Sequence, residues 1–325
     1  MIQKYPYKDL TWIHAESPTS EEVANLVKEY NLHPLVGEDM LSKFSRPRSE
    51  RYPNYIYLVL RVPIRSKIPP TAKGHTHNAY FIDEKEIDFV IGKNFIVTSE
   101  FSVIEPLHNF SKVFETDSIL NASKHRTGSD ENLRVEGSHA GFIFYYMMKR
   151  IYSFMENDLS NMQQSILNVE TEIFSGNERH MVEELSNLSR ELIDFKQASN
   201  THREVIEAFA PMAHGFFGLD FRQYIEDILK EYAKIHELTA NNRELVNELR
   251  DTNDSLLSAK QNEVMKVFTV LAFCTFPLTL IASVFAMKTE YTPIIGQQND
   301  FYIIVGIMIV TALALFGWFR HKKWI

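Results

Sequence analysis

Two long apolar stretches dominate the hydrophobic pattern near the C-terminal end. Residues 267–287 are 21 consecutive positions without a charged side chain, and residues 301–319 are 19 more. At a rise of about 1.5 Å per residue, each stretch can cross a hydrocarbon core of about 30 Å. Two buried helices of a soluble protein are the alternative, but such helices normally keep a polar stripe. The pattern predicts two membrane-spanning helices, 267–287 and 301–319, joined by an external loop, 288–300.

The first hundred residues alternate short strand-like runs with one helical run. Residues 10–14, 55–62, 86–92 and 94–99 are rich in β-branched and aromatic side chains, which favour strands. The last two runs meet at Gly92 and Lys93 and predict a hairpin. Thr19 or Ser20 precedes acidic residues and a helical apolar spacing, which predicts a capped helix. We therefore expect a mixed α/β domain over residues 1–138, with its polar part, 115–138, as a loop or frayed helix.

Glycine and proline divide the next part of the chain into long helices. Residues 142–175 and 177–210 contain neither, and they predict an antiparallel helix pair over 139–218 with Pro211 and Gly215 near its tip. Residues 219–276 also contain neither. They predict a helix of about 85 Å, a stalk over 219–266 that continues into the first span. Because a compact monomer cannot contain such a helix, we expect it to associate with copies of itself.

The flanking charges predict the orientation in the membrane. Arg320, Lys322 and Lys323 lie in the tail, 320–325, and Lys260 and Lys266 precede the first span. Positive residues stay in the cytoplasm, so both ends of the chain are expected inside and the loop outside. The first residues lack an apolar stretch, which predicts no signal peptide.

Composition excludes several classes of protein. The 325 residues have a mean hydropathy of −0.21 and a formal charge of −8, but residues 1–265 alone carry 29 Lys and Arg against 40 Asp and Glu. An acidic body with a net charge of −11 argues against nucleic acid as a partner. The single cysteine, Cys274, permits neither an internal disulfide nor a cysteine-based zinc site.

A seam of small and polar residues follows the long helix into the first span. Alternate steps of four and three residues give a 3.5-residue spacing that keeps one face toward a common axis. Small and hydroxyl side chains in a membrane either allow close helix packing or line water. Asp251 and Asn262 favour a pore, since otherwise they would be buried side by side. The seam consists of Asp251, Ser255, Ser258, Asn262, Met265, Thr269, Ala272, Phe276, Thr279, Ser283 and Ala286.

One helix cannot enclose a channel, so a pore requires an oligomer with a ring of side chains at each seam position. Polar rings would hold a hydrated cation, and the apolar rings of Met265 and Phe276 would gate it by dewetting. Pro277 removes one backbone hydrogen bond, and we expect a bend there.

Several motifs resemble the CorA family of magnesium and divalent-metal transporters. They are QNEVMKV (261–267), FPLTLIASVF (276–285), EYTP (290–293) and the terminal HKKWI, together with NLHPLVGED (31–39), RPRSERYPNYIYLVL (46–60) and IGKNFIVTSE (91–100). The resemblance implies an α/β cytoplasmic domain, a long pore-lining stalk helix and two transmembrane helices. It also implies a CorA-like funnel, a homopentamer, in the cell (inner) membrane.

The resemblance also implies roles for individual residues. The family's pore-lining positions correspond to Asp251, Asn262, Met265 and Thr279. Family members bind regulatory divalent ions between cytoplasmic domains, and the matching acids here are Asp39 and Asp227. Divalent ions (Mg²⁺, Co²⁺, Ni²⁺ or Zn²⁺) would then be both substrate and regulator, with no permanently bound cofactor. Occupied regulatory sites would hold the pore shut, and loss of the ions would open it.

The pore mouth departs from the family pattern. Where the family has Gly-Met-Asn, this chain has Ala286, Met287 and Lys288. Five lysine ammonium groups about 7 Å from an axial divalent ion would repel it by roughly 6 kcal/mol in a water-like dielectric. Salt reduces this repulsion, and Lys288 can swing outward or pair with Glu290. Magnesium selectivity therefore does not carry over from the family.

Three hypotheses follow. The first is a pentameric divalent-cation transporter with an altered entrance filter. The second is a mouth at Lys288 that attracts anions or couples transport to another ion. The third is a non-conducting, membrane-anchored metal sensor or scaffold. An enzyme is not expected, because the chain has no glycine-rich phosphate loop and no nucleophile elbow. His75 and His77 are expected in a solvated loop rather than in a metal site.

Overall fold

The computed structural model describes residues 1–67, 80–112, 138–287, 295 and 299–322. They form two compact units, Met1–Arg250 and Asp251–Ile325. Helix α7 (Arg222–Phe285) contributes residues to both units. The predicted polar loop or frayed helix, 115–138, lies almost entirely outside the described residues, as do His75 and His77.

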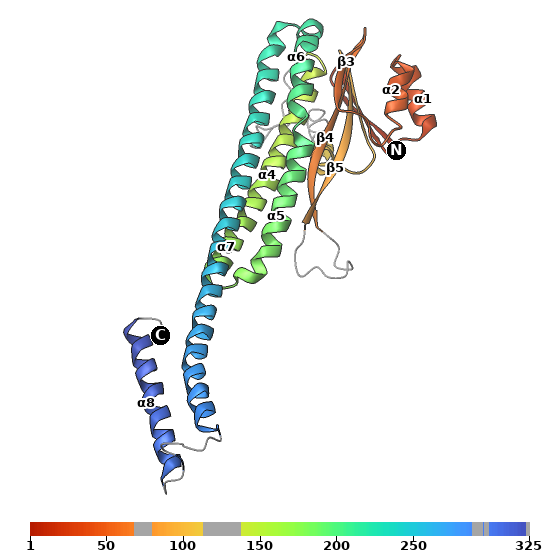
Figure 1. Ribbon diagram of the computed structural model, residues 1–325. Coiled ribbons are helices and arrows are strands. Elements are labelled where there is room, and N and C mark those ends of the chain that lie inside the picture. Colours follow the sequence, from red (N-terminus) through yellow and green to blue (C-terminus); the bar gives the residue numbers. More distant parts are fainter. Residues whose placement is uncertain (68–79, 113–137, 288–294, 296–298, 323–325) are drawn as a thin grey trace. The chain divides into compact units, whose positions relative to one another are not determined.

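A mixed six-stranded sheet lies at the centre of the first unit (Figure 1). Strands β2 and β6 pair in parallel, and every other neighbouring pair is antiparallel. The hairpin predicted at Gly92 and Lys93 is confirmed by the antiparallel pairing of β5 with β6. In order across the sheet, the strands are β1 (Ile2–Tyr7), β2 (Leu10–Glu16), β6 (Phe95–Glu100), β5 (Tyr80–Gly92), β4 (Tyr55–Lys67) and β3 (Arg48–Arg51).

Two short helices cover one face of this sheet, α1 (Ser20–Glu29) and α2 (Pro34–Asp39). Thr19 caps α1 as the sequence predicts: its Oγ1 accepts from the Glu22 backbone N–H at 3.2 Å, and Glu22 Oε2 accepts from the Thr19 N–H at 2.8 Å. Val23 and Leu26 of α1 pack with Val36 of α2 in a core that includes Tyr57 of β4. This apolar contact fixes α2, and therefore Asp39 at its end.

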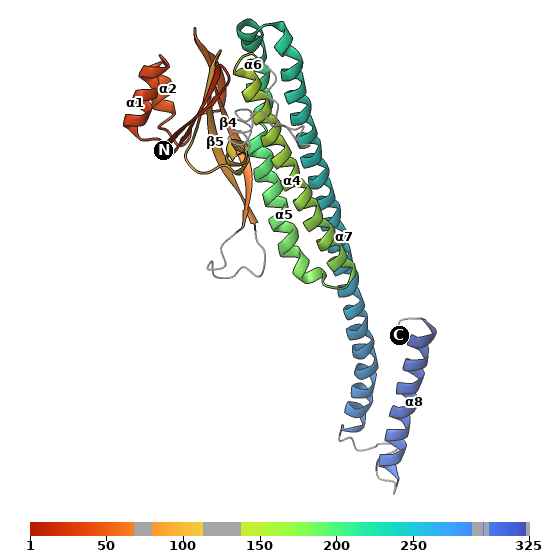
Figure 2. The same cartoon turned by 180° about the vertical axis from the view of Figure 1, so that it is seen from behind.

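Three helices pack on the opposite face, α4 (Gly141–Phe174), α5 (Glu178–Ser199) and α6 (His202–Phe217) (Figure 2). The ring of Phe144 in α4 packs edge-on against Phe89 of β5 at 5.3 Å between centroids, and it also contacts Phe209 of α6. The first unit therefore has three layers, with a sheet between two sets of helices.

The second arm of the predicted helix pair is two helices rather than one. The chain breaks after Ser199, and α6 begins at His202. His202 is fully buried, and its ring nitrogens lie 2.7 Å from the Arg61 carbonyl and 3.2 Å from the Tyr152 hydroxyl. These contacts hold the start of α6 against β4 and α4. Pro211 lies inside α6, and the helix tip predicted near Pro211–Gly218 comes at the end of that segment, where Gly218 follows α6.

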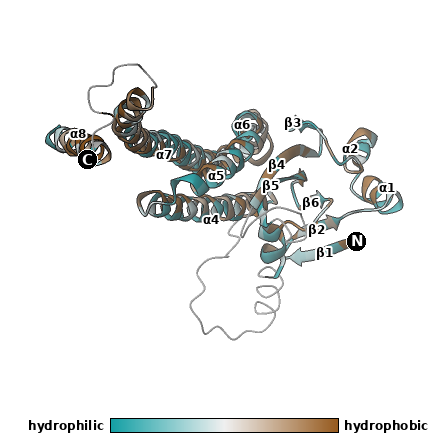
Figure 3. Ribbon diagram, turned by 60° about the horizontal axis from the view of Figure 1, so that its bottom comes forward, coloured by the Kyte–Doolittle hydropathy of each residue, from teal (hydrophilic) through white to brown (hydrophobic). Residues whose placement is uncertain are grey.

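Helix α7 follows a short 3-10 turn, Leu219–Phe221, and has 64 residues. Its first part packs on α4, where Asn242 Nδ2 donates to the Leu159 carbonyl at 3.0 Å. The second unit contains the rest of α7 and α8 (Asp300–His321), whose many apolar residues are brown in Figure 3. Within this unit, the ring centroids of Phe273 and Phe319 lie 6.4 Å apart. Among the described residues, these two helices are long and apolar enough to cross a membrane.

Candidate ion pathway

The predicted seam lies on one uninterrupted helix. Every seam residue from Asp251 to Ser283 belongs to α7, and Ala286 directly follows it. No glycine interrupts the helix, and Pro277 is its single proline. Since residues four and three apart share a helical face, the 3.5-residue spacing places the whole series along one stripe.

The seam is exposed within the single chain. All its members are exposed except Thr269, which is half-buried. Phe276 keeps 72% of its surface accessible and Met265 keeps 56%. Large apolar side chains with this exposure are expected to contact lipid or further protein copies. The seam is therefore available for the ring predicted from the sequence, although a single chain cannot close it.

Three of the seam hydroxyls use their hydrogens within the helix. Thr269 Oγ1 donates to the Met265 carbonyl at 2.7 Å, and Thr279 Oγ1 donates to the Thr275 carbonyl at 2.9 Å. Ser255 Oγ donates to the Asp251 carbonyl at 2.8 Å. A hydroxyl that has donated its hydrogen keeps lone pairs that accept but offers no second donor. These positions can therefore supply oxygen to a cation.

The Pro277 position has a local consequence within α7. Proline has no backbone N–H, so the carbonyl of Phe273, one turn earlier, lacks its usual helical donor. Thr275 Oγ1 donates in the same turn, to the Leu271 carbonyl at 2.9 Å. The helix continues to Phe285 despite the proline. The bend predicted at this position stays a prediction.

The pore mouth predicted from the sequence is described only in part. Ala286 and Met287 close the last turn, with their backbone N–H groups 3.0 Å from the Ala282 carbonyl and 3.3 Å from the Val284 carbonyl. Met287 is 60% exposed. Lys288 and Glu290 lie outside the described residues.

Asp39, the first predicted regulatory acid, is paired within its own chain. It forms an ion pair with Arg48 of β3, and both side chains are partly exposed. Arg48 Nε also donates to Glu50 Oε1 at 2.9 Å. A cation approaching Asp39 would therefore compete with a guanidinium that two carboxylates hold in place.

Asp227, the second predicted acid, is also paired. Its Oδ2 accepts from the Tyr145 hydroxyl at 2.7 Å and from Lys149 Nζ at 3.2 Å, and Lys149 reaches Glu231 Oε1 at 2.5 Å. Burial opposes ionisation of Asp227, but the bonds from Tyr145 and Lys149 outweigh it and lower the pKa of the carboxyl. Burial and then Asp227 raise the pKa of Tyr145 to about 12. Asp227 is therefore an anion with two partners already in place.

The described residues contain no group of three or more His, Cys, Asp or Glu side chains arranged to hold a metal ion. Asp39 and Asp227 were predicted from the sequence, but their partners, Arg48 and Lys149, were not. Asp227 and Glu231 are four residues apart on a predicted helix, which was a signal that they share a face and could share one cation. No comparable pattern linked Lys149 to them, because the contact joins α4 to α7.

Comparison with known proteins identifies a family with this architecture. Residues 7–321 match the family model described as CorA-like Mg²⁺ transporter protein. The cobalt/magnesium transport protein CorA of Thermotoga maritima is 24% identical over 324 residues, covering 98% of this chain and 86% of that protein. The protein of the same name from Methanocaldococcus jannaschii is 20% identical over 317 residues, covering 97% and 92%.

Solved structures give the same fold. The complete structure of the CorA magnesium transporter from Methanocaldococcus jannaschii superposes with a TM-score of 0.78, covering 98% of this chain and 92% of that one at 19% identity. That likeness extends over the α/β layers, the long helix and both apolar helices. Because the family model matches residues 7–321, nearly the whole chain, the chain belongs to the family of CorA-like Mg²⁺ transporter proteins.

Proposed function

We propose that this chain forms a homopentameric transporter or channel for divalent cations, with α7 lining the pore. The observation that carries the proposal is the exposed seam, in which small, hydroxyl and amide side chains follow one stripe of a continuous helix. A cyclic assembly turns each position into a ring, polar at Asn262 and Thr279 and apolar at Met265 and Phe276. Family membership and the relatives' names, cobalt and magnesium transport proteins, support these ions as the substrate class.

The hydroxyl geometry favours a cation over an anion. Thr269 and Thr279 donate to carbonyls of their own helix, so their remaining capacity is as acceptors. Hard divalent cations and their hydration waters use oxygen acceptors, whereas an anion needs donors. This chemistry argues against the hypothesis that Lys288 makes the pore mouth attract anions.

The charge pattern supports a location in the cell (inner) membrane with both ends of the chain in the cytoplasm. The basic tail after α8 and the lysines before the first span flank the apolar segments on one side. The acidic residues 1–265 would then face the cytoplasm.

Regulation by cytoplasmic divalent ions at Asp39 and Asp227 belongs to the proposal. Both carboxylates pair with cations of their own chain, so a divalent ion has to displace Arg48 or Lys149. Both pairs are partly exposed, and such ion pairs contribute little stability, which makes displacement feasible. Metal-dependent protection from limited proteolysis should therefore decrease in Asp227→Asn. Equal protection in both proteins would remove Asp227 from the regulatory site.

Metal uptake tests the proposed function. Purified protein is reconstituted in liposomes, and Mg²⁺, Co²⁺, Ni²⁺ and Zn²⁺ are each offered separately to wild type and Lys288→Asn. We expect uptake of at least one ion by wild type and faster uptake by Lys288→Asn, because the substitution removes five cationic charges from the mouth. Uptake of no ion by either protein would contradict transport and favour a membrane-anchored sensor. Reversal potentials that follow a chloride gradient would favour the hypothesis of an anion-attracting mouth.

A further inference from the structure

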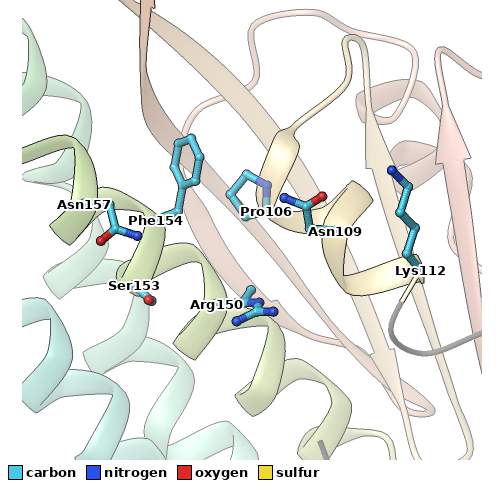
Figure 4. A pocket seen from close by; sticks show the side chains of 7 residues that line it. All are labelled: Pro106, Asn109, Lys112, Arg150, Ser153, Phe154 and Asn157. Carbon is cyan, nitrogen blue, oxygen red and sulfur yellow. The ribbon is translucent and has the colours of Figure 1, made fainter. Parts of the chain in front are cut away.

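A cavity of about 420 Å³ lies in the first unit between the helical residues 105–112 and α4. Four of its lining residues come from one stripe of α4 and three from the facing helix (Figure 4). The volume falls within the range of small-molecule sites. The lining consists of Pro106, Asn109, Lys112, Arg150, Ser153, Phe154 and Asn157.

Every ionisable residue among the described residues that line the cavity is basic. Arg150 and Lys112 are the charged members, and none of the lining residues that the structure describes is acidic. This is unusual in a segment with a net charge of −11, residues 1–265. A cavity lined by one sign of charge concentrates ligands of the opposite sign.

Among the described residues Arg150 has no partner, unlike its neighbour on the helix. Lys149 points to α7 and binds two carboxylates, Asp227 and Glu231. Within the part of the chain that the structure describes, the Arg150 guanidinium has neither an ion pair nor a hydrogen bond. A guanidinium offers five N–H donors in a fixed fork that matches carboxylate and phosphate oxygens. Because Arg150 is exposed, an anionic ligand can reach these donors and replace the water bound to them.

The acids closest in sequence are occupied elsewhere. Glu156 pairs with Lys234 of α7 at 2.7 Å. Asp158 is buried and accepts from the Arg65 backbone N–H at 3.0 Å. Glu105 begins the facing helix but does not line the cavity. Within the described residues, the α4 side of the lining therefore keeps the positive charge of Arg150.

The neutral lining residues indicate the rest of the ligand. In Figure 4 the ring of Phe154 lies beside Pro106, which gives one apolar wall, and the Asn109 amide lies next to that wall. Asn157 and Ser153 add an amide and a hydroxyl on the α4 side. An apolar wall flanked by amides suits a flat heterocycle, which stacks on the wall while its edge accepts and donates hydrogen bonds.

From these features we propose that the cavity binds a nucleoside phosphate, with its phosphate on Arg150 and its base against Phe154 and Pro106. This site is separate from the ion pathway along α7. The cytoplasmic unit would then respond to a nucleotide as well as to metal ions. The proposal does not depend on the transport function, since binding can be measured without flux.

Equilibrium binding of radiolabelled ATP to the purified full-length protein in detergent tests the proposal. EDTA is present, so ATP cannot act by carrying metal ions to the acidic groups. We expect saturable binding of about one ATP per chain, weaker binding of adenosine, and competition by inorganic phosphate. Arg150→Gln should weaken ATP binding at least about tenfold, because it removes a charge-assisted bidentate contact. Arg190→Gln on α5, an exposed arginine outside the cavity, should leave binding unchanged.

Two further variants separate the parts of the ligand. Phe154→Ala should weaken ATP binding about tenfold and leave competition by phosphate unchanged, because only the base stacks on the ring. Asn157→Ala replaces an exposed side chain and gives a second lining variant if Arg150→Gln folds poorly. The proposal is overturned if wild type shows no saturable ATP binding. It is also overturned if Arg150→Gln and Asn157→Ala, folded by circular dichroism, bind ATP as wild type does.

Discussion

The two units of this chain satisfy their side chains in different ways. In Met1–Arg250, apolar residues such as Trp12 and Phe144 are fully buried, and charged residues of the interior have partners in the same chain. In Asp251–Ile325, apolar residues such as Phe268 and Leu271 are each 60% exposed. The first unit builds its own core, whereas the second exposes surface that water would disfavour.

This difference teaches where the function depends on other molecules. A unit that buries its own apolar core does not need further copies to cover that core. A helix with an exposed apolar surface and a polar seam leaves surface that lipid or further copies of the chain would cover. Substitutions should therefore affect folding in the first unit and assembly or transport in the second.

The largest expected effect compares two phenylalanines. Phe144→Ala removes a fully buried ring that packs on Phe89 and Phe209, and it should lower the free energy of unfolding by about 3–5 kcal/mol. Phe276→Ala, at a 72% exposed position, should change it by less than about 0.5 kcal/mol. Urea unfolding in detergent, followed by the fluorescence of buried Trp12, measures both. Equal losses would show that the seam is part of the folded core of one chain.

A buried ion pair gives the next effect. Arg65 of β4 donates from Nε to Glu191 of α5 at 2.9 Å, and both side chains are 6% exposed. Glu191→Ala leaves the guanidinium without its carboxylate and should cost about 3 kcal/mol.

The double variant Arg65→Met with Glu191→Leu removes both charges and should recover most of that loss. Thermal unfolding of the three proteins measures the pattern. A double variant as unstable as Glu191→Ala would mean that the pair itself, rather than the unpaired charge, sets the stability.

A third effect depends on pH through Glu100 at the end of β6. Burial raises its pKa from the ordinary 4.5 to about 8, although the Ile104 backbone N–H donates to the carboxylate at 3.3 Å. Between these two values the folded chain keeps a proton that the unfolded chain releases. The free energy of unfolding therefore falls as pH rises, by at most about 1.4 kcal/mol per pH unit, and levels off above about pH 8.

Between about pH 6.5 and pH 8, the effect of Glu100 on stability can be measured with little contribution from the buried histidines. Burial lowers the pKa of His14, His139 and His202 to about 4, so each destabilises the fold only below about pH 6.5. Glu100→Gln should reduce the change in the free energy of unfolding by about 1.6 kcal/mol across that range. Chemical unfolding at several pH values checks this, and an unchanged slope would assign the dependence to another buried acid such as Asp88, whose pKa burial also raises.

The smallest effect concerns the contact between α4 and α7. Lys149 and Asp227 are each 37% exposed, so solvent screens the pair. Lys149→Met should therefore lower the free energy of unfolding by less than about 1 kcal/mol. Lys230→Met, a nearby lysine of α7, serves as the matched control. A loss above 3 kcal/mol for Lys149→Met alone would show that this contact belongs to the core.

The sequence predicted much of the fold because local patterns encode it. The capping pair Thr19 and Glu22, the hairpin at Gly92 and the helix free of glycine over residues 219–276 are all short-range signals. Local patterns did not predict β1, α2 and β3, which are short and depend on pairing and packing with distant residues. The break between α5 and α6 was also missed, because buried His202 rather than a glycine or proline fixes it.

The candidate site could likewise be predicted only where local spacing along the chain encodes it. The seam on α7 follows from helical spacing, so it could be identified without coordinates. The partners of Asp39 and Asp227 come from other elements, and no spacing along the chain reveals them. The cavity at Arg150 likewise depends on two helices that meet only in the folded unit.

Divalent-ion uptake by two variants that differ by one position along α7 tests the central claim most directly. Asn262 lies on the seam and Gln261 lies beside it, and both side chains are exposed in the single chain. Purified Asn262→Leu and Gln261→Leu are reconstituted in liposomes, and initial uptake rates are compared with wild type for whichever metal wild type transports. The account predicts at least a tenfold loss for Asn262→Leu and a rate within twofold of wild type for Gln261→Leu. Equal rates for both variants, or no uptake of any metal by wild type, would contradict an ion pathway along the seam.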